Sequence, residues 1–282
     1  MGSKFEHNEY TGFEVQPSVR LHWTPEDFYS FWAAASRAVR TPSRAEDSFE
    51  YTLATIPPGA FLPLFPGAGI AQVAGNKDLD AEDLYAFELG CRVHATQKLS
   101  IDIATFYNIY ENLRSGQAGQ PYIDMTSGAP IMIVPATTNN GMKGKSFGAE
   151  LAVDWFVSTD WKLKGAYSYL NLRLDAKNTG GQVPEERNNP YHQLSIRSAL
   201  NLPANLFLDL WGRYVDSINF KGVGSYITAD VRLGKHITDN IEVSITGQNL
   251  LEPSRLEYGP EQLVTVQTET GRSVYGKLLW HF

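Results

Sequence analysis

The sequence has no apolar run long enough to cross a membrane as a helix. The most apolar long stretch, residues 57–75, is interrupted by prolines and glycines. A membrane-spanning helix needs about 20 consecutive, predominantly apolar residues. The N-terminal segment MGSKFEHNEYTG also lacks the basic stretch and apolar core that mark a secretory signal. We therefore expect that any membrane contact is made by strands, and that any export signal lies outside this sequence.

Cysteine is almost absent, since Cys91 is the only one in 282 residues. A single cysteine excludes an internal disulfide and supports neither a redox pair nor a zinc cluster, so we interpret it as a small apolar residue. The six histidines are scattered and show no metal-ligand spacing. We expect no metal site and no cofactor.

Clustered positive charge is also missing. The chain has 24 Lys and Arg against 31 Asp and Glu, which gives a net charge of −7 and a pI near 5.4. Binding to a phosphate backbone needs grouped basic residues, and here they are dispersed, which excludes nucleic acid as a partner. Aromatic residues, by contrast, make up 12% of the chain and extend from Phe5 to Phe282. The sequence shows no change of character midway that would indicate a second domain.

Segments of about ten residues that alternate between apolar and polar side chains recur along the whole chain, which predicts strands rather than helices. The clearest is 99–109, where Leu99, Ile101 and Ile103 share one face. The other predicted strands are 14–23, 28–38, 83–95, 145–157, 161–172, 191–202, 206–215, 226–233, 241–248 and 272–282, with a partial strand near 3–8. The sequence thus predicts an all-β, antiparallel, up-and-down fold of about a dozen strands.

The connections between these strands alternate in length. Short ones are predicted at 24–27, 95–98, 158–160, 203–205 and 236–240, and long ones, rich in Gly, Pro, Asn and Thr, at 39–82, 111–144, 173–190, 216–224 and 251–271. Short turns at one rim and long loops at the other are typical of outer-membrane β-barrels, with the short turns facing the periplasm.

The two faces of the predicted strands differ in composition. One face carries charges of both signs and is expected to line a hydrated lumen; its candidates are Arg20, Arg37, Glu88, Arg92, Asp102, Glu150, Asp154, Arg197, Asp209, Arg213, Asp230 and Arg232. The other is apolar and places aromatic residues near strand ends, where membrane interfaces concentrate them; these are Trp23, Trp155, Trp161, Tyr167, Tyr169 and Trp280. A soluble β fold, whose polar face would meet bulk water, remains the alternative.

The last strand ends the chain on an aromatic residue. In 272–282, Leu278, Trp280 and Phe282 fall on one face, and Trp280 and Phe282 resemble the C-terminal signal by which outer-membrane proteins are recognised for insertion. An ordinary final strand would show the same alternation.

Several segments, taken in order, resemble the TonB-dependent outer-membrane receptors, and in particular the C-terminal half of their barrel domain. They are WAAASRAVRTPSR (32–44), GNKDLDAEDLYAFELGCR (75–92), LSIDIATFYNIYENL (99–113), SFGAELAVDW (146–155), GAYSYLNL (165–172), ITADVRLG (227–234), VSITGQNLLEP (243–253) and RSVYGKLLWHF (272–282). No single segment is decisive, but their order and spacing are specific to this family.

The resemblance implies a Gram-negative outer-membrane receptor that takes up a scarce nutrient, such as an iron–siderophore complex, with energy relayed by TonB. Family members have an N-terminal plug and a barrel of about 22 strands, so residues 1–282 are expected to be the C-terminal part of the barrel domain, without a plug. The implied partners are outer-membrane lipid, the barrel-assembly machinery, and the missing plug and N-terminal barrel half. TonB would contact the protein only through the absent plug segment.

A chain with about a dozen strands is also expected to leave two unpaired edges, and so to form an incomplete or open barrel. The alternative function is that of a soluble or extracellular β-rich binding protein. Because receptors of this family bind ligands with outer loops, the resemblance implies ligand contacts at Tyr51, Phe61, Phe65, Tyr122 and Arg187.

A catalytic function is not expected. Gly144 to Gly148 fits the G-x-S-x-G pattern of a hydrolase nucleophile, but Ser146 would need a preceding strand and a following helix to be presented. Here a loop rich in Gly and Asn precedes it and an alternating strand follows.

Overall fold

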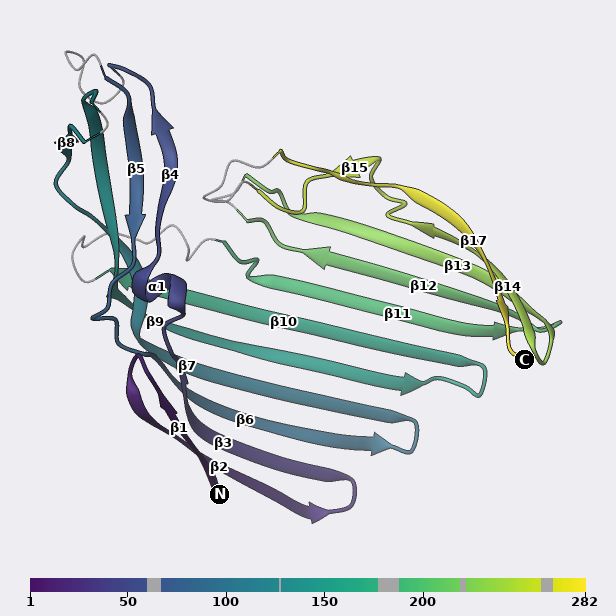
Figure 1. Cartoon of the computed structure of the whole chain (residues 1–282). Coiled ribbons are helices and arrows are strands. Elements are labelled where there is room, and N and C mark those ends of the chain that lie inside the picture. The colour runs from purple at the N-terminus through teal and green to yellow at the C-terminus, as the bar shows by residue number, and fades with distance from the viewer. Residues whose placement is uncertain (60–66, 127, 177–187, 219–221, 260–265) are drawn as a thin grey trace.

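The computed structural model describes residues 1–59, 67–126, 128–176, 188–218, 222–259 and 266–282. Twelve strands follow one another as neighbours in a single curved sheet (Figure 1). They are β1 (Gly2–Asn8), β2 (Gly12–Glu26), β3 (Tyr29–Arg40), β6 (Glu82–Thr96), β7 (Leu99–Ala118), β9 (Ile131–Phe156), β10 (Trp161–Ala176), β11 (His192–Leu202), β12 (Leu206–Val215), β13 (Tyr226–Thr238), β14 (Ile241–Gln248) and β17 (Ser273–Trp280). Every pairing between consecutive members of this series is antiparallel. The predicted all-β, up-and-down fold is confirmed.

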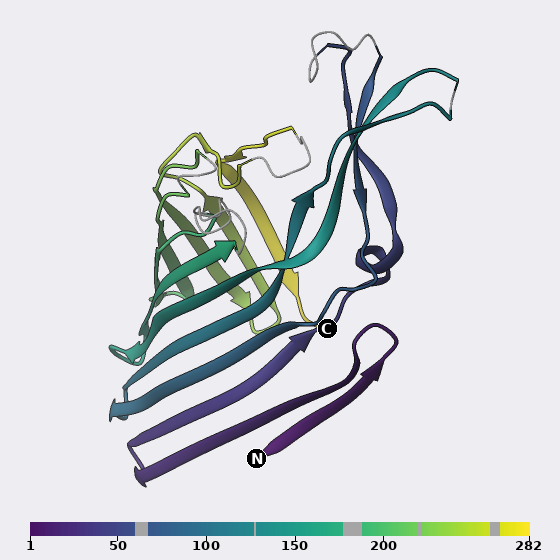
Figure 2. The ribbon, with the colours of Figure 1, turned by 90° about the vertical axis from the view of Figure 1, so that its left-hand side faces the viewer.

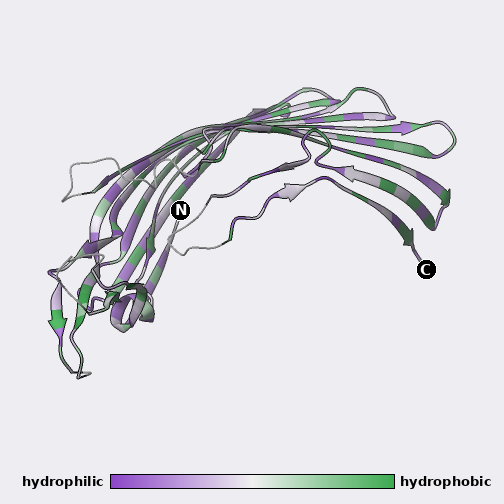
Figure 3. Ribbon diagram, turned by 90° about the horizontal axis from the view of Figure 1, so that it is seen from above, coloured by the Kyte–Doolittle hydropathy of each residue, from purple (hydrophilic) through white to green (hydrophobic). Residues whose placement is uncertain are grey.

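The sheet does not close. Its order begins at β1 and ends at β17, and across the described part of the chain these two strands do not pair with each other. Seen from above, the sheet is an arc that leaves the two ends of the chain apart (Figure 3). The open barrel expected from the strand number is therefore what the structure shows. The described strands of the wall do not form a sandwich of two packed sheets.

A second region projects beyond the long-loop rim of the wall (Figure 2). Here β4 (Glu50–Ile56), β5 (Gly69–Ala74) and β8 (Tyr122–Asp124) join the upper part of β9, residues 131–137. We call these strands the projecting sheet. Strand β5 runs parallel to β9, which makes it the one parallel pairing among the described strands.

The projecting sheet corrects the prediction that 39–82 and 111–144 are loops. Strands β7 and β9 continue as a long hairpin past the rim, through a bulge at Asn112, whose φ is +54°. Polar side chains support this hairpin, because Asn139 Nδ2 donates to Gln117 Oε1 at 2.7 Å and the backbone N–H of Gly141 donates to Ser115 Oγ at 3.0 Å. Within this hairpin, Pro135, Asn139, Asn140 and Gly141, which suggested a loop, lie in β9.

Little of the chain is buried. Buried apolar side chains are few among the described residues, and include Met132 and Ile133 of the projecting sheet and Phe207 of β12. Large apolar residues of the wall are exposed instead, with Leu89 at 62%, Ile196 at 52% and Leu278 at 69%. None of the described helices is long and apolar enough to cross a membrane, since the helix present, α1 (Arg44–Ser48), has five residues.

Candidate functional site

Strand register divides the wall into two faces. Residues that are directly opposite one another in neighbouring strands share a face, so the pairs of Asp154 with Lys164, Lys164 with Arg197, and Asp209 with Arg232 define one side. We call it the polar face, and the opposite side the apolar face. Eleven of the twelve candidate lumen-facing residues lie on the polar face: Arg20, Glu88, Arg92, Asp102, Glu150, Asp154, Arg197, Asp209, Arg213, Asp230 and Arg232.

Arg37 is the exception, and its predicted place was wrong. It lies opposite Tyr85, in the row that continues to Phe87 on the apolar face. Its guanidinium reaches sideways, where Nη2 is 2.6 Å from Asp83 Oδ1 and Nη1 donates to the carbonyl of Val15 at 2.5 Å. A charged group is tolerated here because Arg37 is close to the end of β3, where the apolar face gives way to the loop rim.

Ion pairs connect the polar face across successive strands. Asp209 lies 3.7 Å from Arg197 and 3.5 Å from Arg232, and Arg232 also pairs with Glu242. Further along the same face, Asp154 is held between two lysines, Arg92 pairs with Asp102, and Arg213 pairs with Asp230 at 2.7 Å. Most of these groups are only partly buried, so each pair contributes about 1 kcal/mol or less. Together they form a surface on which opposite charges alternate.

The upper end of the polar face, near the long loops, holds a denser cluster. The loop after β14 folds back so that Arg255, in the short strand β15 (Ser254–Arg255) paired with β16 (Thr270–Gly271), is 8% exposed. Its guanidinium donates to Asn249 Oδ1 at 2.9 Å and lies 4.6 Å from the ring centroid of Tyr226. Asn249 in turn donates its backbone N–H to Asp230 Oδ1 at 2.9 Å. This cluster joins the returning loop to the wall.

An aromatic side chain stands among these charges. The indole N–H of Trp211 donates to Ser195 Oγ at 2.7 Å, and the Arg213 guanidinium lies 4.2 Å from the indole centroid. Both side chains line a groove of about 690 Å³ that extends over β6, β7 and β9 to β12 and also contacts Arg92, Asp102 and Gln193. Sequence reasoning missed Trp211, Tyr226 and Arg255. The available signal was that Trp211 lies midway between Asp209 and Arg213, and therefore on their face.

Three aromatic rings of the polar face lie against a glycine in the neighbouring strand. The pairs are Trp32 with Gly90, Phe106 with Gly148, and Phe207 with Gly234. A Cβ added at these glycines would come within 2.3 Å, 2.5 Å and 2.1 Å of the respective rings. Only glycine allows such an approach, so each ring lies flat on the backbone of the next strand.

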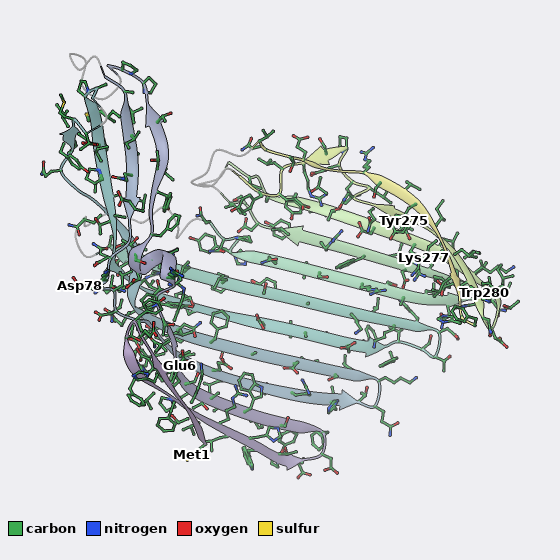
Figure 4. The ribbon with its side chains drawn as sticks, viewed as in Figure 1. Met1, Glu6, Asp78, Tyr275, Lys277 and Trp280 are labelled. Atoms are coloured by element: carbon green, nitrogen blue, oxygen red, sulfur yellow. The ribbon has the colours of Figure 1, made fainter. Side chains whose placement is uncertain are left out.

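The apolar face carries aromatic residues at two levels. Near the short turns it presents Trp23, Phe31, Trp155, Trp161 and Trp280, and toward the loops it presents Tyr85, Phe87, Tyr107, Phe147 and Tyr169. Tyr167 is directly opposite Leu151 and lies between the two levels. Trp280 lies at the short-turn end of β17, beyond Tyr275 and Lys277 (Figure 4). From Trp155 to Phe147 the strand covers eight residues, or about 26 Å at about 3.3 Å per residue. At the strand tilt of about 35–45° in outer-membrane barrels, this length spans about 18–21 Å of membrane height, which covers most of their apolar band of about 25 Å.

The candidate ligand residues are not brought together. Tyr51 lies on β4 and Tyr122 on β8, and the order β4, β5, β9, β8 places two strands between them. Both rings are about half exposed. Phe61, Phe65 and Arg187 lie outside the described residues. Ser146 lies inside β9, buried and bonded to Asn108 and Tyr110, which is not the strand-to-helix turn of a nucleophilic serine.

A buried carboxylate fixes the base of the projecting sheet, and sequence reasoning missed it as well. Glu46 of α1 bonds Arg40 of β3 at 2.6 Å, pairs with Arg114 of β7, and accepts the backbone N–H of Ser43 at 2.8 Å in a capping box. Burial alone would raise the pKa of Glu46, but the hydrogen bonds from Arg40, Ser43 and Arg114 outweigh burial and lower the pKa to about 2. The S-x-x-E spacing from Ser43 to Glu46 was the available signal.

Comparison with known proteins supports the same interpretation. The chain superimposes on the siderophore receptor PirA from Acinetobacter baumannii with a TM-score of 0.76 and 16% identity, covering 99% of this chain and 42% of that one. For a mutant (G324V) of the ferric enterobactin receptor PfeA from Pseudomonas aeruginosa the TM-score is 0.75, with 16% identity and the same coverages. For the siderophore receptor PirA from Pseudomonas aeruginosa the TM-score is 0.64 and the identity is 19%, and the match covers 97% of this chain and 43% of that one. No curated protein sequence matches the chain.

An open antiparallel sheet with one charged face, and one apolar face between two aromatic levels, is the wall of a membrane-spanning β-barrel. The chain spans less than half of the length of the solved receptors that it matches. Residues 1–250 match the family described as TonB dependent receptor-like, beta-barrel. The chain belongs to this family, whose members are receptors of the Gram-negative outer membrane rather than enzymes.

Proposed function

We propose that this chain forms the C-terminal part of the barrel wall of an outer-membrane receptor that takes up an iron–siderophore complex. The observation that carries the proposal is the groove on the polar face, in which Trp211 and Arg213 lie beside one another above a surface of paired charges. The names of the related receptors, for siderophores and for ferric enterobactin, support the ligand class.

The chemistry of the upper polar face suits such a ligand. Ferric complexes of catecholate siderophores are anionic and present flat aromatic rings, which arginines and aromatic side chains bind through charge, stacking and cation–π contacts. Arg213 and Trp211 supply these groups in the groove. Tyr51 and Tyr122 remain proposed contacts that a ligand would meet earlier, on the projecting sheet.

The partners follow from the same proposal. Energy from TonB would reach the receptor through a plug, and residues 1–282 would complete a barrel with strands that lie outside this sequence. The exposed apolar face would contact outer-membrane lipid. Trp280 and Phe282, whose rings lie 6.2 Å apart, would form the signal read by the barrel-assembly machinery.

Two matched tryptophans allow a direct test in detergent micelles. Trp211 on the polar face and Trp161 on the apolar face each donate an indole N–H to a serine, Ser195 and Ser198 respectively. Titration with ferric enterobactin is expected to quench tryptophan fluorescence, after correction with free tryptophan. Trp211→Phe should remove most of this quenching, whereas Trp161→Phe should leave the fractional quenching of the remaining tryptophans close to that of the parent chain.

Arg213→Gln provides a second measurement on the same groove. Loss of one charge-assisted contact is expected to weaken binding by about tenfold. Equal quenching in the parent chain and in Trp211→Phe, with no effect of Arg213→Gln, would exclude the groove as the ligand site.

A further inference from the structure

The groove on the polar face has a floor of small side chains. Ala152 of β9 is directly opposite Ala166 of β10, and Ala166 is opposite Ser195 of β11. Ser195 is in turn opposite Arg213 of β12 and accepts the indole N–H of Trp211. All five residues line the groove, and their strands are neighbours in the wall (Figure 1). The groove therefore runs across the strands and ends, on the β12 side, at a cation and an aromatic ring.

Acidic residues line the other end of the groove, namely Asp102, Glu150 and Asp154. Two of them are neutralised within the protein, because Arg92 Nε donates to Asp102 Oδ2 at 2.6 Å and Asp154 Oδ1 lies 3.3 Å from Lys162 Nζ. Glu150 differs, since no basic group of the described residues lies at ion-pair distance from it. Its exposed carboxylate therefore carries a negative charge that the described part of the wall does not compensate.

The immediate neighbours of Glu150 are uncharged. Register places Ala104 of β7 on one side of it and Ser168 of β10 on the other, and Gly148 and Ala152 precede and follow it on the same side of β9. A carboxylate in a groove attracts a cation more strongly than one on a convex surface, because the walls of the groove exclude part of the screening water. Glu150 is therefore placed to bind a cationic group that enters the groove.

The two ends of the groove are close enough for one ligand to contact both. Glu150 lies on β9 and Arg213 on β12, which are three strand spacings apart, or about 14 Å at about 4.8 Å per spacing. Between them the floor is formed by Ala166 and Ser195, whose small side chains leave room for a flat ring. The groove volume of about 690 Å³ is within the usual range of small-molecule sites.

We infer that the ligand of this groove carries a cationic group, such as a primary amine, in addition to the anionic aromatic part that Arg213 and Trp211 bind. The ammonium pairs with Glu150 through a charge-assisted hydrogen bond, while the aromatic part lies at the opposite end of the groove. The inference rests on the proposed siderophore function and makes it more specific, because it distinguishes iron chelates that bear an amine from chelates that are wholly anionic.

Glu88 provides a matched control on the same face. It is exposed, lies on β6 directly opposite Phe106 of β7, and has no basic group at ion-pair distance in the part of the chain that the structure describes. It is not among the described residues that line the groove. Glu88→Gln and Glu150→Gln therefore remove the same charge from the polar face, but only Glu150→Gln changes the groove. The strand content of both variants is checked by circular dichroism.

The experiment compares two ligands that differ by one charge, titrated into the full chain in dodecyl maltoside micelles and measured by isothermal titration calorimetry. One is a ferric tris-catecholate chelate with an aminohexyl arm, and the other is the same chelate with its amine acetylated, which removes the positive charge. The parent chain and Glu88→Gln should bind the amine chelate about fivefold more tightly. Glu150→Gln should bind the two chelates equally. Added salt should reduce the preference of the parent chain, because it screens the pair.

Other outcomes separate this inference from the proposed function. Equal affinity of the parent chain for the two chelates, with weaker binding in Trp211→Phe, would overturn the inference and leave the siderophore proposal standing. A preference that persists in Glu150→Gln would assign the amine to another carboxylate and would overturn the inference as well. A folded parent chain that binds neither chelate would overturn the siderophore proposal, and the inference with it.

Discussion

Strand β9 runs through two regions of this molecule that treat apolar side chains in opposite ways. In the projecting sheet, Met132 and Ile133 are 3% and 4% exposed, packed among β4, β5 and β8. In the wall, Leu151 and Trp155 of the same strand are 37% and 43% exposed. The upper region buries these two β9 residues against its other strands, although Leu53 of β4 and Ile123 of β8 stay 42% and 53% exposed, whereas the lower region presents its apolar residues outward on one face. The boundary between them lies at the bulge near Asn112, where the wall ends.

The largest expected effect comes from a charge placed on the apolar face of the wall, which would contact lipid in the proposed receptor. Leu151 and Ala152 are adjacent but lie on the apolar and polar faces respectively. Leu151→Arg should reduce the unfolding free energy in micelles by about 2–4 kcal/mol, the cost of a charge near the bilayer midplane. Ala152→Arg, surrounded by polar groups, should change it by about 0.5 kcal/mol or less. Equal costs measured by denaturant titration would mean that the two faces meet the same solvent.

A smaller effect is expected from filling the space beside a glycine of the wall. A Cβ at Gly148 would lie 2.2 Å from the carbonyl oxygen of Tyr169 and 2.5 Å from the Phe106 ring, whereas at Gly165 the nearest atom is 3.9 Å away. Gly148→Ala should therefore cost about 1–3 kcal/mol of unfolding free energy. Gly165→Ala is the control and should be close to neutral. A neutral Gly148→Ala would show that Phe106 does not lie flat at this position.

The projecting sheet should respond locally. Ile133→Val removes one buried methyl group and should lower the stability of this sheet by about 0.5–1.5 kcal/mol, measured by hydrogen exchange of the β5 and β9 amides. Ile123→Val, at a residue that is 53% exposed, is the control. Neither variant should alter micelle association, and an effect of Ile133→Val on the wall would contradict the separation of the two regions.

The smallest effect concerns pH. The pKa of Glu46 is lowered to about 2, below its ordinary value, so its stabilising contribution is present above pH of about 4.5 and is lost as pH falls toward 2. Because Arg40 and Arg114 are about half exposed, we expect about 0.5–1 kcal/mol. Protection of the Gly75 and Asn76 amides, which bond the carbonyls of Phe49 and Glu46, should fall over that range after correction for intrinsic exchange.

Two variants check the assignment to this carboxylate. Glu46→Gln should show the reduced protection already at pH 7 and little further loss in acid. Asp47→Asn changes the neighbouring acid of α1 and should behave like the parent chain. A parent-like pH profile in Glu46→Gln would assign the titration to another group.

The wall was predictable and the projecting sheet was not, for a physical reason. In the wall, one face is apolar and the other is polar. Because successive side chains of a strand point to opposite faces, apolar and polar residues alternate in the sequence there. In the upper part of β9, IMIVPATTNNGM, both faces contact protein and the residues include Pro135, Asn139 and Asn140. The alternation disappears, and these residues resemble a loop. Their backbone and side chains are satisfied by partners distant in the sequence, such as the amide of Gly119, which donates to the carbonyl of Pro135.

The candidate site was predicted in part for the same reason. Eleven of the twelve charged candidates share a face. They lie in strands without interruptions, where every second residue points to the same side. Arg37 was assigned to the polar face because it is charged, although it is on the same side of β3 as Phe31 and Ala35. Arg255 could not be placed, because it reaches the wall through a returning loop rather than through a strand. Contacts made by such a loop have no periodic signal in the sequence.

The rings that lie on glycines, Trp32 on Gly90, Phe106 on Gly148 and Phe207 on Gly234, determine how far these side chains rise above the polar face. A ring that stands upright would extend further from the polar face and would change the profile of that face whenever the side chain rotated. A ring held against the next strand adds little more than one van der Waals layer, about 3.5 Å, and cannot rotate away without losing that contact. The polar face therefore keeps a low and fixed profile at these three points along the wall.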